Sequence, residues 1–298
     1  MRLQFSDPDR FIPLRACLAA GGGRQEAYQK KNHSLINSWN RCHLLYTEIM
    51  KNKSELPAHA FYAEVLKILK DSKFTFMVAG GFAVNAYTGL RRPTKDIDIF
   101  VKAGDYPKIL NKFTSLGYKT QVSDERWIAK IFKGKFYVDL IFGSSNLVAP
   151  VTDDWFKDSH TAKFFKYEVK IPSVTDLIWS KVFIQNRERY DGADVAHLIL
   201  MKNHEINWER LLCSMEQYWE VLLVHLLNFR FIYPSEREKI PSWLLRELLS
   251  RLQHQFELPT PKMKVCRGRM FSVADYTVDV TELGFADVVG GENERKAG

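Results

Sequence analysis

The stretch that decides the fold spans residues 74–98 and reads FTFMVAGGFAVNAYTGLRRPTKDID. Its first part, Phe74–Ala79, is short and apolar, which predicts a buried strand that ends at Gly80-Gly81. A short helix is expected over Phe82–Thr88, and Ile97–Val101 predicts a second strand. Glycines between a strand and a helix let the backbone approach a phosphate closely, and the N-terminus of the helix offers free N–H groups. A tight turn is the alternative interpretation of these glycines.

Two aspartates, Asp96 and Asp98, close this stretch, and the alternation of a strand turns both toward one face. Two like charges that close repel each other unless a cation lies between them, and Mg²⁺ binds carboxylates together with substrate phosphates. A third carboxylate, Asp139, lies in the apolar run Phe136–Phe142, where a charge needs a partner. The three aspartates therefore predict a site for two Mg²⁺ ions, with Asp139 as the general base that takes a proton from an attacking hydroxyl. The alternatives are a solvent-facing Asp-x-Asp strand and an Asp139 that pairs with a core arginine.

The sequence on either side of this stretch predicts an α/β unit that is followed by helices. Helices are expected over Pro57–Lys70 and Asp105–Leu116, and a hairpin from the strands Trp127–Phe132 and Phe136–Phe142. Ser173 is placed to cap a helix over Val174–Asn186. Further helices are expected over Gly192–Met201, Trp208–Cys213, Tyr218–Phe231 and Ser242–Gln255, and extended pieces over Met270–Val273 and Tyr276–Val280.

The chain is expected to divide into four regions. Residues 1–56 form an N-terminal extension that is partly helical, with an amphipathic helix over Leu35–Met50. An α/β domain is expected over residues 57–170 and a helical domain over residues 171–260. Residues 261–298 are interpreted as a C-terminal tail.

The central pattern resembles the signature of the nucleotidyltransferase superfamily, the polymerase-beta-like fold. That signature has Gly-Gly or Gly-Ser, a short helix, Asp-x-Asp and a third Asp on a later strand, here Gly80-Gly81, Asp96, Asp98 and Asp139. Gly81 stands where many members have Ser, so the backbone N–H must replace the hydroxyl contact, as in the Gly-Gly branch. The resemblance implies a mixed sheet with flanking helices, an all-helical C-terminal region and nucleotide contacts at Gly80, Gly81, Arg92 and Thr94. It also implies Mg²⁺-dependent transfer of a nucleoside monophosphate from an NTP to a hydroxyl, with release of pyrophosphate.

A second match lies downstream, at Lys181, Arg187, Asp191 and Asp194. It resembles the Lys, Arg and Asp-x-x-Asp pattern of the AbiEii-type nucleotidyltransferases, the toxin half of some bacterial type IV toxin–antitoxin systems. The resemblance implies that Lys181 contacts the triphosphate, that Asp191 and Asp194 are candidate site residues, and that an antitoxin is a candidate partner. The alternative is that Lys181 is a solvated helix residue and that both aspartates only cap the next helix. Residues 80–98 also resemble aminoglycoside and lincosamide nucleotidyltransferases, so the chemistry is better defined than the acceptor.

The composition limits the class of protein and of partner. The 298 residues are 46% hydrophobic and carry a formal net charge of +8, which is compatible with an anionic partner such as a nucleotide or RNA. No stretch reaches the roughly 18 to 20 apolar residues of a membrane span, and four scattered cysteines suit free thiols in a reducing cytoplasm. An RNA and a small molecule both stay open as acceptors, and the basic charge favours RNA. A non-catalytic nucleotide-binding module is a further alternative, although the presence of all three carboxylates counts against it.

Overall fold

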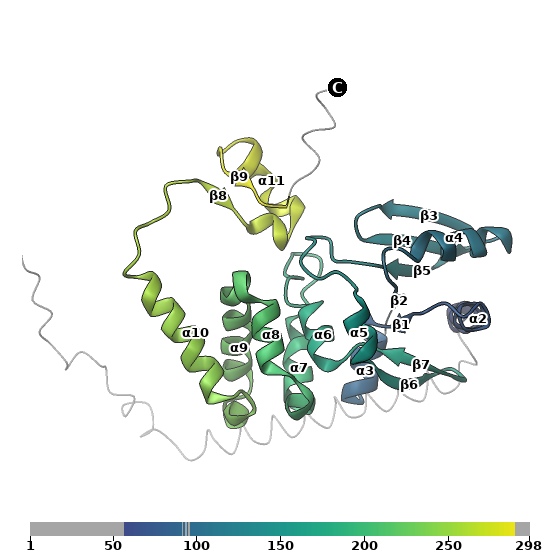
Figure 1. The fold of residues 1–298 in the computed structure, drawn as a ribbon, viewed down its shortest axis with the longest axis horizontal. Coiled ribbons are helices and arrows are strands. Elements are labelled where there is room, and N and C mark those ends of the chain that lie inside the picture. Colours follow the sequence, from purple (N-terminus) through teal and green to yellow (C-terminus); the bar gives the residue numbers. More distant parts are fainter. Residues whose placement is uncertain (1–56, 91, 93, 95, 290–298) are drawn as a thin grey trace, which may run out of the picture. The chain divides into compact units, whose positions relative to one another are not determined.

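The computed structural model describes residues 57–90, 92, 94 and 96–289 (Figure 1). The chain is divided into two units, residues 1–56 and 57–298, and all of the described residues belong to the second. The predicted N-terminal extension and its helix over Leu35–Met50 lie outside the described residues. The second unit is built around one large sheet and the helices that pack on it.

The large sheet has seven strands in the order β3-β4-β5-β2-β1-β7-β6 (Figure 1). β2 runs parallel to β5 and antiparallel to β1, and β1 pairs in parallel with β7. Antiparallel pairs complete both edges, β3-β4-β5 on one and β6-β7 on the other. The strands are β1 (Met77–Val78), β2 (Ile97–Phe100), β3 (Lys119–Asp124), β4 (Ile128–Lys133), β5 (Phe136–Ile141), β6 (His160–Phe164) and β7 (Tyr167–Ile171). The predicted mixed α/β sheet is confirmed.

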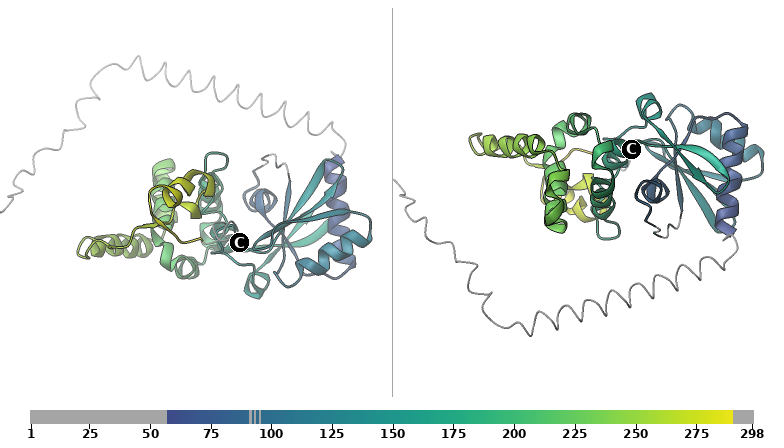
Figure 2. Two further views of the ribbon diagram at one scale, coloured as in Figure 1. Left: turned by 90° about the horizontal axis from the view of Figure 1, so that it is seen from above. Right: turned by 90° about the horizontal axis from the view of Figure 1, so that it is seen from below.

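Two helices, α2 (Pro57–Asp71) and α4 (Tyr106–Ser115), lie on one side of the sheet (Figure 2). Alternate strand residues point into the core beneath them, among them Ile97, Ile99, Ile131, Val138 and Leu140. The same alternation turns Asp98 and Phe100 to the opposite face. There Phe100 packs against Trp155 of the short helix α5 (Asp153–Lys157), with ring centroids 5.7 Å apart. The sheet therefore keeps its charged site residues away from the larger core.

The helix α3 (Gly80–Thr88) connects the sheet with the helices that follow it, because it packs against β2, α6 (Val174–Trp179) and α7 (Gly192–Lys202). Ser173 caps α6 as predicted, since its side chain accepts a hydrogen bond from the backbone N–H of Asp176. The remaining predicted helices are also present, as α8 (Trp208–Ser214), α9 (Trp219–Ile232) and α10 (Ser242–Gln255). No helix of the part of the chain that the structure describes is long and apolar enough to cross a membrane.

Three predictions after β7 are wrong. The helix expected over Val174–Asn186 ends at Trp179, and a turn follows whose first residue, Ser180, donates from its hydroxyl to the carbonyl of Leu177 at 2.7 Å. This local side-chain bonding competes with the helix. The extended piece expected over Tyr276–Val280 lies within the helix α11 (Val273–Thr281), which Ser272 caps by accepting from the N–H of Asp275. The piece expected over Met270–Val273 instead joins a 3₁₀ turn, Gly268–Met270, to α11.

Two boundaries and three strands also differ from expectation. The strand expected over Phe74–Ala79 is confined to Met77–Val78, and the helix expected from Phe82 already begins at Gly80. The strand β3 and the hairpin β6-β7 were not predicted. β3 and β6 are the two edge strands and are largely exposed, so apolar alternation marks them weakly. β7 does alternate, with Val169 and Ile171 buried and Glu168 and Lys170 exposed, and this signal was missed. Short parallel strands β8 (Val265–Cys266) and β9 (Ala286–Asp287) accompany α11.

Candidate active site

Strand pairing brings two of the predicted carboxylates together. Asp98 of β2 is the direct partner of Asp139 of β5 in the parallel register, so both side chains leave the sheet on the same face. Neighbouring strands lie about 4.8 Å apart. Asp96 precedes β2 and is reached by the hydroxyl of Tyr137, which donates to its Oδ2 at 3.4 Å. Three acidic side chains are thus arranged around the junction of β2 and β5.

The electrostatics of the carboxylates differ from one to the next. Burial, and then the like charge of Asp96, raise the pKa of Asp98 to about 6. Burial also raises the pKa of Asp139, which is 8% exposed, although a hydrogen bond from Lys130 opposes the shift. Lys130 of β4 is the cross-strand partner of Asp139, and the two form an ion pair. The alternative interpretation, in which Asp139 pairs with a core arginine, is therefore wrong, because its partner is a lysine.

Both positions after β1 require glycine, because neighbouring side chains approach the backbone there closely. Gly80 has a φ of +53°, and a Cβ at this position would lie 1.6 Å from Asp98 Oδ2. A Cβ on Gly81 would lie 2.4 Å from the side-chain methyl of Thr94. Gly80 and Gly81 open α3, where the first N–H groups of a helix lack intrahelical partners and the helix dipole is positive. The start of α3 therefore presents N–H donors directly beside the Asp98 carboxylate.

A cluster of charges anchors the cations of the site. Lys181 is 2% exposed and donates from Nζ to Asp191 Oδ2 at 2.7 Å, and its Nζ lies 2.8 Å from Asp194 Oδ2. Arg92 forms an ion pair with Asp194. Lys181 is therefore not a solvated helix residue: it follows α6 in a turn and is buried. The capping alternative fails for Asp191, since its side chain makes no cap hydrogen bond to α7.

An arginine that the sequence did not single out, Arg189, lines the cavity of the site. Its Nε and one terminal nitrogen donate to the two oxygens of Asp191 at 2.9 and 3.0 Å. Burial tends to raise the pKa of Asp191, but the charges of Lys181 and Arg189 outweigh burial and hold it below its usual value. Arg187, the arginine of the resemblance, instead is 88% exposed in its side chain and pairs with Asp275 at 3.0 Å. The Arg-x-Asp spacing of residues 189–191 is the one sequence signal that favours Arg189.

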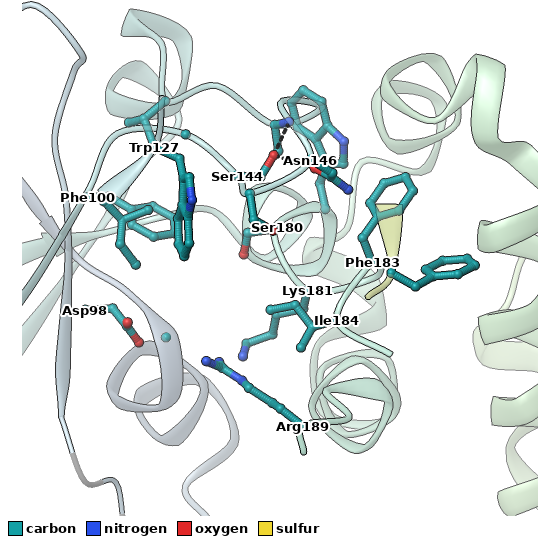
Figure 3. A pocket seen from close by; sticks show the side chains of 18 of the residues that line it. Asp98, Phe100, Trp127, Ser144, Asn146, Ser180, Lys181, Phe183, Ile184 and Arg189 are labelled. Atoms are coloured by element: carbon teal, nitrogen blue, oxygen red, sulfur yellow. Dashed lines mark hydrogen bonds between the residues drawn. The ribbon is translucent and has the colours of Figure 1, made fainter. Parts of the chain in front are cut away.

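Asp98 and Gly80 face Lys181 and Arg189 across one cavity of about 150 Å³. In Figure 3 the carboxylate of Asp98 points toward the ammonium of Lys181 and the guanidinium of Arg189, which come from the turn between α6 and α7. The cavity wall continues as a group of aromatic side chains: Phe100, Trp127, Trp155, Trp179, Phe183 and Phe271. A pocket with one charged end and one aromatic end suits a ligand that joins phosphates to a planar ring.

The carboxylates of the site offer oxygen donors of the kind that bind a metal ion. Asp96 and Asp98 offer hard oxygen ligands two residues apart, the type that Mg²⁺ prefers, and their mutual repulsion is what a cation relieves. Asp139 is already engaged by Lys130. Over the described ranges, no three side chains of His, Cys, Asp or Glu are gathered closely enough to hold a metal. Asp96 and Asp98 therefore fit an ion. For Asp139 to bind the same ion, its carboxylate has to give up the ion pair with Lys130.

A family profile and a curated relative match parts of this chain. The profile of a family described as "Nucleotidyl transferase of unknown function (DUF2204)" matches residues 58–225, more than half of the chain. A lincosamide resistance protein of Staphylococcus haemolyticus is 34% identical over 74 residues, which cover 24% of this chain and 45% of that protein. The match thus spans less than half of the length of this curated relative.

Solved structures with similar folds have low sequence identity. A lincosamide antibiotic adenylyltransferase with lincomycin bound has 20% identity and a TM-score of 0.35, over 48% of this chain and 96% of that chain. ANT(2'')-Ia in complex with adenylyl-2''-tobramycin has 14% identity and a TM-score of 0.38, over 60% and 99% of the two chains. The Megavirus polyadenylate synthase has 15% identity and a TM-score of 0.34, over 65% of this chain and 40% of that chain.

Proposed function

Since this chain belongs to the family described as "Nucleotidyl transferase of unknown function (DUF2204)" and is a nucleotidyltransferase, we propose that it moves a nucleoside monophosphate from an NTP to a hydroxyl acceptor. The observation that carries the proposal is the cavity in which Asp98, beside the start of α3, faces Lys181 and Arg189. The triphosphate binds between the N–H groups of Gly80-Gly81 and these two cations. Arg92 and Thr94 complete the nucleotide contacts.

Mg²⁺ is the proposed cofactor, as two ions held by Asp96, Asp98 and Asp139. When bound, the ions neutralise the charge of the triphosphate and favour ionisation of the attacking hydroxyl. Asp98 is poorly solvated and lies beside another carboxylate, so it gains most from an added cation.

The residues of the chain bind the substrates, orient them and accept one proton. The acceptor oxygen attacks the α-phosphorus, the bond from that phosphorus to the bridging oxygen breaks, and pyrophosphate leaves toward Lys181 and Arg189. Asp139 accepts the proton of the hydroxyl. Asp191 fixes the guanidinium of Arg189 through two hydrogen bonds, which leaves three of its five N–H donors for phosphate oxygens. Asp191 and Asp194 therefore act as positioning residues for the cations.

RNA is the proposed acceptor, in a toxin-like enzyme of the AbiEii type that pairs with an antitoxin protein. The net charge of +8 supports this choice because RNA is a polyanion. A small molecule of the antibiotic type is the second candidate, and the identity of 34% with a lincosamide resistance protein over 74 residues favours it.

One assay separates these candidates. The purified protein is incubated with Mg²⁺ and each of four α-³²P-labelled NTPs, in turn with total cellular RNA, lincomycin or tobramycin. We expect label in a discrete RNA band, loss of transfer when EDTA removes Mg²⁺, and loss of transfer in Asp98→Ala. Labelled antibiotic without labelled RNA would select the second candidate. Binding of an NTP with no transfer to any hydroxyl would support a nucleotide-binding module, and no binding of Mg²⁺ and NTP would refute the proposal.

A further inference from the structure

A row of side chains leads from the candidate active site to the edge of the sheet. Across β3, β4, β5 and β2, the strand pairing places Gln121, Lys130, Asp139 and Asp98 opposite one another in turn. Directly paired residues project from the same face of a sheet. The two outer members of the row thus lie on the same face as the two carboxylates.

A second row runs beside the first and contains two aromatic rings. Lys119, Phe132 and Tyr137 are opposite one another in β3, β4 and β5. The rings of Phe132 and Tyr137 have centroids 6.2 Å apart, and Tyr137 reaches Asp96 with its hydroxyl. We call Lys119, Gln121, Lys130, Phe132 and Tyr137 the hairpin face.

The hairpin face is open to solvent. Lys119 and Gln121 are exposed, and both aromatic residues are partly exposed. The opposite face of the same strands is covered by α2 and α4, which bury Ala129, Ile131, Val138 and Leu140 (Figure 2). Phe132 and Tyr137 are members of neither hydrophobic cluster of the described residues. Packing inside the protein therefore does not account for their position.

At its outer edge, away from Asp98 and Asp139, this face offers a cation to an anion. Lys130 is compensated by Asp139, whereas Lys119 lies at the exposed edge with its ammonium 5.6 Å from the centroid of the Phe132 ring. A cation held loosely over an aromatic ring can move to a phosphate when a planar group takes its place on the ring. A strand of phosphates and bases meets a cation and aromatic rings at this edge.

We propose that the hairpin face binds the end of a single-stranded RNA, with a base stacked on Phe132, a phosphate at Lys119 and the terminal hydroxyl directed toward Asp139. β4 is one strand from β5 and β3 is two, which places these contacts about 5 and 10 Å from the Asp139 strand. Adjacent groups of one nucleotide chain can span such a distance. This inference rests on the proposed function for the reacting hydroxyl, but the binding surface itself can be measured without turnover.

The test measures by fluorescence anisotropy how a 12-nucleotide single-stranded RNA binds, with Mg²⁺ and without NTP. The RNA carries fluorescein at its 5′ end, and its 3′ end is free. Phe132→Ala is expected to weaken binding by about 5- to 150-fold, the range for loss of one stacked base. Lys119→Ala is expected to lower the slope of log K against log salt by about 0.7, as for one phosphate contact on a single strand. The matched controls are Phe231→Ala, at a ring 87% exposed on α9, and Lys112→Ala, at an exposed lysine on α4. Both controls are expected to bind like the parent.

Several results would overturn the inference. They are unchanged affinity in Phe132→Ala, equal losses in the two control variants, or equal competition by single-stranded RNA and its duplex. If Phe132→Ala does not fold by circular dichroism, Phe132→Leu keeps an apolar side chain while it removes the stacking ring. Transfer to lincomycin that is unaffected by Phe132→Leu, without RNA binding, refutes the hairpin face and leaves the proposed function intact. RNA binding that depends on Phe132, without any transfer, refutes the proposed function alone.

Discussion

Asp98→Asn is expected to stabilise the protein in the absence of divalent ions. The carboxylate of Asp98 has a pKa raised from 3.8 to about 6 by burial and by Asp96, so ionising it costs the folded state free energy. Between these two values the folded chain binds more protons than the unfolded chain, and stability therefore falls as the pH rises through that window. The full difference of about 2.2 pK units corresponds to about 3 kcal/mol at pH 7.5 and about 1 kcal/mol at pH 4.5. The neutral, isosteric amide removes this penalty.

The assay is urea denaturation in EDTA, followed by circular dichroism, for the parent and for Asp98→Asn at both pH values. We expect a gain in unfolding free energy of about 3 kcal/mol at pH 7.5 that shrinks to about 1 kcal/mol at pH 4.5. Adding Mg²⁺ should raise the midpoint of the parent and leave that of the variant nearly unchanged, because the ion relieves the same repulsion.

Asp154→Asn serves as the control, because this exposed α5 carboxylate pairs with Lys157 and its pKa is lowered, the opposite direction. It should show no gain at either pH. A gain in Asp98→Asn that is the same at pH 4.5 and pH 7.5, or no gain at all, would refute the assigned origin of the Asp98 shift.

Three further changes test the site. Gly80→Ala should lower the melting temperature and abolish nucleotide binding, because the added Cβ overlaps Asp98 and the φ of this residue is positive. Gly89→Ala is the control. Gly89 has a similar φ and no atom within 4 Å of an added Cβ, so this variant measures the backbone strain alone. Arg189→Ala should raise the KM for NTP about tenfold or more, as expected for a lost charged contact of 1.5–3 kcal/mol, while Arg187→Ala should leave it unchanged; equal effects would contradict the assignment of Arg189. Lys181→Met should cost about 1.5–3 kcal/mol of stability in urea denaturation, because it removes the buried cation between Asp191 and Asp194 and leaves them with Arg189 and Arg92 as partners; a loss below 1 kcal/mol would show that the cation is dispensable for the fold.

Sequence patterns predicted the elements whose causes are local. Apolar residues at helical spacing mark α2 and α4, an oxygen side chain before α6 marks its cap, and the apolar run of β5 follows a Lys-Gly-Lys turn. Each of these depends on residues within a few positions of one another. The same reasoning failed over Val174–Asn186 and Tyr276–Val280, where side-chain bonds of Ser180 and Ser272 to nearby backbone groups accompany the end of one helix and the start of the other.

By itself, the sequence determined the Gly-Gly and Asp-x-Asp arrangement and the order strand, helix, strand, because alternation and helix entry are properties of a few consecutive residues. Only the tertiary structure decided that Asp139 lies opposite Asp98, that Lys130 contacts it, and that Arg189 rather than Arg187 faces the cavity. Those relations depend on which strands pair and on which side of a turn each side chain emerges. Strand pairing joins residues that are far apart in the chain, and local patterns contain no record of the partner.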